Sequence, residues 1–126
     1  MPIAVPGLVL LDSVTQVEFG HAGQLVVTGS HGGASVVPYA RAVRAWMYVF
    51  NDAGVGKDGA GVAALDLLQA DGIAAAAVAH DSARIGEALD TWENGVVSHV
   101  NEGALALGLQ AGQPLATQLL RAPIGR

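Results

Sequence analysis

Residues 26–33 read Val26-Val27-Thr28-Gly29-Ser30-His31-Gly32-Gly33, an apolar run that ends in a Ser-His pair flanked by glycines. Residues 48–54 and 77–84 repeat this plan, because in each an apolar run passes into polar residues. Short apolar runs bounded by turn residues are typical of buried strands. The three segments therefore predict three buried strands, each followed by a polar loop.

Helical signals lie between these strands. Pro38 is tolerated in a first helical turn and predicts a short helix that runs to Arg44. Asp58 is the expected N-cap of a helix that continues to Ala70 and stops before Gly72. Further helices are expected over residues 83–93, 101–109 and 114–120, followed by a frayed tail over 122–126. One strand is expected at the start of residues 7–18, and the rest of that segment is expected to be extended. Further strands are expected over residues 24–28, 46–50, 73–79 and 96–100.

Strands that alternate with helices of about ten residues form βαβ units and a parallel sheet. We therefore expect one α/β domain over residues 1–126, in three layers, with a mostly parallel sheet of about four to five strands and helices on both faces.

The composition narrows the classes of partner. Only 13% of the residues are charged while 52% are apolar, which predicts that apolar surface is covered in a homo-oligomer. The net charge is −5 and the six basic residues do not cluster, which argues against nucleic-acid binding. Without cysteine there is no disulfide, thiolate metal site or cysteine nucleophile. The longest apolar run, residues 73–79, is too short to cross a bilayer, so we expect a cytoplasmic protein without membrane contact.

The three polar loops are expected to form one site. In a parallel α/β sheet, ligands bind outside the carboxyl ends of the strands, and neighbouring strands lie about 4.8 Å apart. All three polar clusters follow the carboxyl ends of their predicted strands, whereas the returns from helix to strand carry only turn residues.

Four residues are candidates for catalysis. His31 and His80 are the expected acid/base groups, because histidine titrates near neutral pH. Asp52 is the expected orienting carboxylate, and Ser30 is a nucleophile only if a histidine lies within hydrogen-bond reach. Six further residues are expected to bind a ligand through backbone N–H groups, polar side chains or positive charge: Gly32, Gly33, Asn51, Lys57, Ser82 and Arg84.

Several candidates also have structural interpretations. His31 can be a solvated residue of a tight turn, and Lys57 a solvated loop lysine. Residues 51–61 are rich in glycine, but Asp58 follows Lys57 where a phosphate loop needs Ser or Thr, so a nucleoside triphosphatase is not expected.

The third loop has structural alternatives as well. Ser82 or Asp81 can cap the following helix. Arg84 in a first helical turn opposes the helix dipole, so it needs an anionic partner, which is either a ligand or a carboxylate of the protein, Glu87 or Asp90.

Two further questions concern a metal site and the polar residues at the end of the strand expected over 96–100. His99 and Asn101 either complete the site or seal an interface. His31, Asp52, His80 and His99 offer nitrogen and oxygen ligands for an ion such as zinc, but none has the local spacing of a metal motif. No metal site is assigned, and the cofactor stays open.

These residues support two hypotheses. The first is an enzyme, a hydrolase or a lyase or isomerase, that uses histidine acid/base chemistry on a carbonyl- or carboxylate-bearing metabolite. The alternative is a non-catalytic module that binds an anionic metabolite or nucleotide. A purely structural assembly role gives no reason for polar residues to gather at strand ends.

Three motifs resemble those of a family of small bacterial α/β proteins to which no activity is attached. They are Val-Thr-Gly-Ser-His-Gly-Gly (27–33), Asn-Asp-Ala-Gly-Val-Gly-Lys-Asp (51–58) and His-Asp-Ser-Ala-Arg-Ile-Gly (80–86), and Ser-His-Val-Asn (98–101) fits the same family. A strand ending in His-Gly followed by one ending in Asp-Ala is also similar to the loops of caspase-like peptidases. Gly54 stands where such a peptidase has its cysteine, so that likeness does not support proteolysis.

Overall fold

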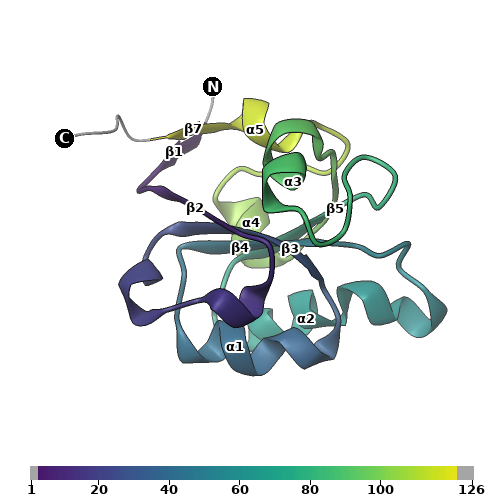
Figure 1. Ribbon diagram of the computed structural model, residues 1–126, viewed down its shortest axis with the longest axis horizontal. Helices are drawn as coiled ribbons and strands as arrows, with labels where there is room; N and C mark the ends of the chain where they lie inside the picture. Colours follow the sequence, from purple (N-terminus) through teal and green to yellow (C-terminus); the bar gives the residue numbers. More distant parts are fainter. Residues whose placement is uncertain (1–2, 122–126) are drawn as a thin grey trace.

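The centre of the fold is a five-stranded sheet in the order β2-β3-β4-β5-β6, in which only β6 runs antiparallel to its neighbour. The computed structural model describes residues 3–121. The strands are β2 Leu8–Leu11, β3 Leu25–His31, β4 Met47–Asn51, β5 Ala75–Val78 and β6 Val97–Val100. A mostly parallel sheet with helices on both faces confirms the expected α/β class (Figure 1).

Alternation along the strands divides the core into two layers. Val27 and Val49 are paired in register and face one side of the sheet with Ala76. Their neighbours Val26 and Tyr48 face the other side. Because both faces of the central strands are covered, these strands read as continuous apolar runs.

Helices α1 Val37–Ala42 and α2 Ala63–Ala70 cover one face, below the sheet in Figure 1. Helices α3 Ala88–Asn94 and α5 Leu115–Gln118 lie above it. Helix α4, Glu102–Ala106, packs Ala104 into the core on the same side as α3. A two-stranded parallel sheet of β1 Ile3–Val5 and β7 Leu119–Arg121 joins the two ends of the described chain. The 3₁₀ segments among residues 3–121 are η1 Val14–Gln16, η2 Phe19–His21, η3 Ala34–Val36 and η4 Lys57–Val62, which is interrupted at Asp58 and Gly59.

Most predicted elements are present within a few residues of their expected positions. The helix predicted from Pro38 is α1, with Pro38 in its first turn. Gly72 follows α2 with φ +73, the left-handed conformation in which glycine ends a helix. Asn101 caps α4 by accepting the N–H of Ala104 at 3.0 Å, as its type predicted.

Four expectations were wrong. Asp58 is no helix cap, because it and Gly59 have positive φ, and α2 begins only at Ala63. The helix predicted over 83–93 begins at Ala88, because Gly86 donates its N–H to Gly29 on β3 and holds the preceding turn out of the helix. The helix predicted over 114–120 stops at Gln118, where the chain turns into β7. The extended segment expected up to Glu18 instead contains η1. The tail expected over 122–126 lies outside the described residues.

Between residues 3 and 121 no helix is both long enough and apolar enough to span a lipid bilayer.

Candidate functional site

The segments that follow two neighbouring parallel strands run to opposite faces of the sheet. The chain leaves β4 for α2 on one face, whereas the chain leaving β5 leads to α3 on the other (Figure 1). The strand order itself is sequential, and this divergence lies at the carboxyl ends of the parallel strands, the edge at which open α/β sheets bind their ligands. Asp52 directly follows β4, and His80 lies two residues beyond β5, so both stand at this point.

The Asp52 carboxylate is buried, with 6% of its side chain exposed, and hydrogen bonds occupy both of its oxygens. Oδ1 accepts the backbone N–H groups of Gly54 at 2.8 Å and His80 at 3.0 Å. Oδ2 accepts the hydroxyl of Ser98 at 2.7 Å. Asp52 therefore connects the loops after β4 and β5 with the start of β6.

Two opposing effects set the pKa of Asp52. Burial raises the pKa, because it disfavours the charged form. The hydrogen bonds from Ser98, Gly54 and His80, with the positive potential of the His80 ring, outweigh burial and lower the pKa below its ordinary value. Asp52 is therefore an anion at neutral pH and accepts hydrogen bonds without donating one.

The His80 ring lies over this carboxylate and is open to solvent. Its Nδ1 is 3.4 Å from Asp52 Oδ1, and 60% of the side chain is exposed. A Cβ at position 54 would lie 3.7 Å from His80 Nδ1, so Gly54 lies against the ring. Because Nδ1 faces the carboxylate, Nε2 lies on the other side of the ring. This arrangement favours an Nδ1–H tautomer that leaves Nε2 free to accept a proton.

A second histidine reaches the same carboxylate through a serine. His99 Nδ1 is 2.9 Å from Ser98 Oγ and 4.0 Å from Asp52 Oδ2. Ser98 was not among the residues predicted for the site. It lies near the start of β6, and only the antiparallel direction of β6 brings that start to the carboxyl end of β5.

His31 ends β3 and is exposed. Its Nδ1 accepts the backbone N–H of Gly33 at 2.9 Å, so neutral His31 carries its proton on Nε2 and presents a donor. Among residues 3–121 no hydrogen bond or ion pair joins His31 to Asp52, His80 or His99. His31 and Asn51 are nevertheless register partners on adjacent strands, so His31 stands at the same sheet edge.

The backbone N–H groups of the glycine-rich loops are largely used within the protein. Gly32 donates to Asn51 O and Gly33 to His31. After β4, Ala53 donates to the Asn51 side chain, Gly54 to Asp52 Oδ1, and the next two residues to backbone oxygens of the same loop. These groups are therefore not free to form the anion-binding nest expected from the glycines.

Three other predicted site residues hold the protein's own backbone. Ser30 Oγ accepts the N–H of Val14 at 2.9 Å. The Asn51 side chain is buried, where it donates to Ala83 O and accepts from Ala53. Ser82 Oγ donates to Ala79 O and accepts the N–H of Val96, which ties its loop to the start of β6. Neither Ser82 nor Asp81 caps a helix, since Glu87 stands at the N-cap position of α3.

Both predicted cations lie at the surface. Arg84 is 82% exposed, and its Nη1 lies 3.9 Å from Glu87, so a carboxylate of the protein is close to it. Arg84 precedes α3 instead of lying in its first turn, so the argument from the helix dipole does not apply. Lys57 begins η4 and is exposed.

Asn101 lies at the opposite edge of the sheet. Its side chain accepts from Ala75 at the start of β5 and donates to Leu65 O and Ile73 O. Because β6 is antiparallel, residues that follow it leave the edge that carries Asp52. Asn101 therefore supports α2, α4 and β5 instead of completing the site.

In the part of the chain that the structure describes, no group of three or more His, Asp or Glu side chains is arranged to hold a metal ion.

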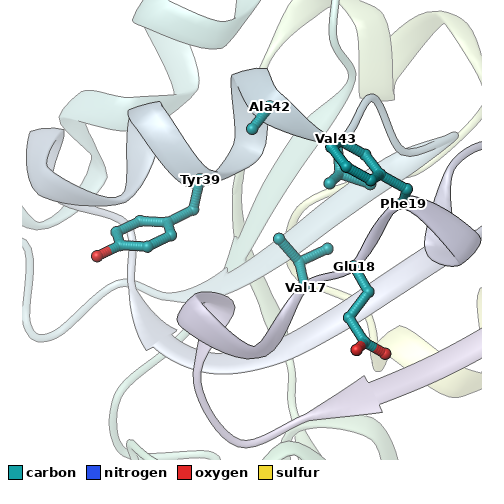
Figure 2. A pocket seen from close by; sticks show the side chains of 6 residues that line it. All are labelled: Val17, Glu18, Phe19, Tyr39, Ala42 and Val43. Atoms are coloured by element: carbon teal, nitrogen blue, oxygen red, sulfur yellow. The ribbon is translucent and has the colours of Figure 1, made fainter.

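A separate pocket of about 360 Å³ lies between residues 17–19 and α1 (Figure 2). Its walls come from Val17, Glu18, Phe19, Tyr39, Ala42 and Val43. In Figure 2 the Val17 side chain points towards α1, while the Glu18 carboxylate points away from that helix. None of the predicted site residues lines this pocket, so it is not part of the cluster around Asp52.

Comparison with known proteins found no matching family model, no similar curated protein and no similar solved structure.

Proposed function

We propose that the protein is a small-metabolite enzyme that uses histidine acid/base chemistry on a carbonyl- or carboxylate-bearing compound. One observation carries this proposal: a buried, ionised carboxylate at the carboxyl ends of the parallel strands lies 3.4 Å from Nδ1 of an exposed histidine ring. The residue types and the Asp52 to His80 distance fit a general base with its orienting acid. They support proton transfer or water activation as the chemistry of this site.

His80 is the proton acceptor in this proposal. Its Nε2 takes a proton from the substrate or from water, and the negative charge of Asp52 stabilises the imidazolium that forms. Gly54 keeps the space against the ring free of a side chain. His31, with a proton on Nε2, is the candidate donor to a substrate oxygen at the same sheet edge.

The loop contacts favour this enzyme over the alternative binding module. A backbone nest for an anionic metabolite or nucleotide needs free N–H groups. The N–H groups of Gly32, Gly33 and residues 53–56 already have acceptors, and Arg84 lies beside Glu87 at the surface. Lys57 and Arg84 remain candidates for holding a substrate carboxylate at the rim.

The test combines binding with turnover. The protein is incubated with a panel of carbonyl and carboxylate metabolites, and melting shifts and NMR signals of products are recorded. We expect a compound that raises the melting temperature and is converted. His80→Gln should lower turnover at least about 100-fold while binding changes far less.

His21→Gln is the matched control, because His21 accepts the N–H of Glu18 and lies in η2 outside the site. It should leave turnover unchanged. The proposal is overturned if a compound binds without conversion and His80→Gln binds it as tightly as wild type, which is the result expected of the binding module. Conversion that survives His80→Gln would also overturn it.

A further inference from the structure

Ser98 stands between the buried carboxylate and the second histidine of the site. Its Oγ is 2.7 Å from Asp52 Oδ2 and 2.9 Å from His99 Nδ1. A second acceptor, Ala77 O, lies farther from Oγ, at 3.3 Å. The serine hydroxyl thus has two close polar neighbours and a single proton to share between them.

The proton positions follow from the neighbours. Asp52 is ionised and only accepts hydrogen bonds, so at 2.7 Å the proton of Ser98 Oγ points to Oδ2. Ser98 Oγ can then interact favourably with His99 only by accepting. His99 Nδ1 must therefore carry a proton, and the neutral ring leaves the lone pair on Nε2.

We propose that Ser98 is a positioning residue that relays the negative charge of Asp52 to His99 and fixes His99 Nε2 as a second proton acceptor. Its meaning for catalysis rests on the proposed function of the Asp52 and His80 site. The relay itself is a property of the free protein. Asp52 then orients two histidines, His80 through Oδ1 and His99 through Ser98 on Oδ2.

The surroundings of His99 agree with this role. The His99 side chain is 39% exposed, so part of it is accessible to solvent while Nδ1 lies beside Ser98 Oγ. His99 is paired with Ala77 across β5 and β6, which fixes its backbone. Ser98 is half-buried beside the buried Asp52, where exchange of its hydrogen bonds with water is hindered.

The experiment reads the tautomer of each histidine by nitrogen-15 NMR at neutral pH in the full chain without added ligand. His99 signals are assigned with His99→Gln. In wild type we expect a protonated Nδ1 and an unprotonated Nε2 for His99. His21 and His31 both accept a backbone N–H at Nδ1 and should show the opposite pattern, which makes them internal references.

Two variants separate the relay from general damage to the fold. Ser98→Ala should move His99 towards the Nε2-protonated tautomer, whereas Ser98→Thr keeps a hydroxyl and should preserve the wild-type pattern. Unchanged His21 signals verify folding in each variant. The relay is overturned if wild-type His99 carries its proton on Nε2, or if folded Ser98→Ala keeps the Nδ1 proton. If Ser98→Ala does not fold, the His99 tautomer in the wild-type and Ser98→Thr spectra still tests the relay.

Failure of the relay and failure of the proposed function give different results. The tautomer is measured without a substrate, so a metabolite screen without conversion leaves the relay standing. Conversion that depends on His80, combined with an Nε2-protonated His99, would overturn the relay alone.

Discussion

Asp52 and His80 are connected twice: Asp52 Oδ1 accepts the His80 backbone N–H at 3.0 Å and lies 3.4 Å from the His80 Nδ1. The same oxygen therefore holds the backbone of His80 by a hydrogen bond and lies beside its ring. Any change that removes this charge affects the loop after β5 and the proposed chemistry together, and stability must be measured beside activity.

Asp52→Asn should destabilise the protein in a pH-dependent way. The folded-state pKa of Asp52 is lowered, so its charge contributes stability above the unfolded-state pKa of about 4, and this contribution is lost as pH falls through the folded pKa. We expect a loss of about 1–3 kcal/mol in unfolding free energy at pH 7, and a smaller difference from wild type at pH 3. Urea unfolding at both pH values measures it.

Glu93→Gln is the control for the loss of one negative charge, because Glu93 is exposed on α3. It should change the unfolding free energy by less than about 0.5 kcal/mol at either pH. A gap between Asp52→Asn and wild type that is the same at pH 3 and pH 7 would contradict the pH prediction.

Asn101→Ala should be strongly destabilising. The buried side chain accepts from Ala75 and Ala104 and donates to Leu65 O and Ile73 O, so its removal takes one hydrogen-bond partner from each of four backbone groups. We expect a loss of at least about 3 kcal/mol, measured by urea unfolding. Asn94→Ala, which removes an exposed amide bonded to Asp90, should cost less than about 1 kcal/mol.

Gly29→Ala should disturb the contact between β3 and the turn before α3. A Cβ at position 29 would collide with Glu87 N and Gly86 C and lie 2.7 Å from Asp12 O, all backbone atoms that cannot rotate away. We expect destabilisation of about 2 kcal/mol or more in thermal or urea unfolding. Gly20→Ala has open space around its Cβ and should be nearly neutral. Equal effects of the two substitutions would refute the packing argument.

Val55→Gly should be unusually well tolerated. Val55 has φ +66, which is strained for a β-branched residue, and glycine removes that strain. Val17 is also half-buried but has ordinary extended backbone, with φ −65 and ψ 140. We expect Val55→Gly to retain about 1–2 kcal/mol more stability than Val17→Gly in parallel urea titrations. Equal losses would show that the loop stores no strain at Val55.

The central strands are predictable because their signal is local. Residues 24–28 and 46–50 are rich in β-branched and aromatic residues, and 73–79 is uniformly apolar, so burial on both faces leaves its pattern in each run. The β1 and β7 pair carries no such signal. Each strand has three residues, and each is stabilised by a partner at the other end of the chain.

The placement of candidate site residues was predictable where it depends on parallel strand order. Asp52 and His80 follow adjacent parallel strands, so the sequence alone indicates that they are close. The positions of Ser98 and Asn101 could not be predicted in this way. The run Val96 to Val100 predicts a strand but does not indicate whether that strand is parallel or antiparallel to its neighbour. The reversal of β6 brings Ser98 to the site and takes Asn101 away from it.

The pairing of β1 with β7 also bears on the order of events during synthesis. Ile3 is paired with Leu119, so this small sheet closes only after nearly the whole described chain has left the ribosome. The β2 to β5 sheet joins sequence neighbours and can assemble earlier, strand by strand. The strands that precede Asp52 and His80 can thus be in place before β1 and β7 pair.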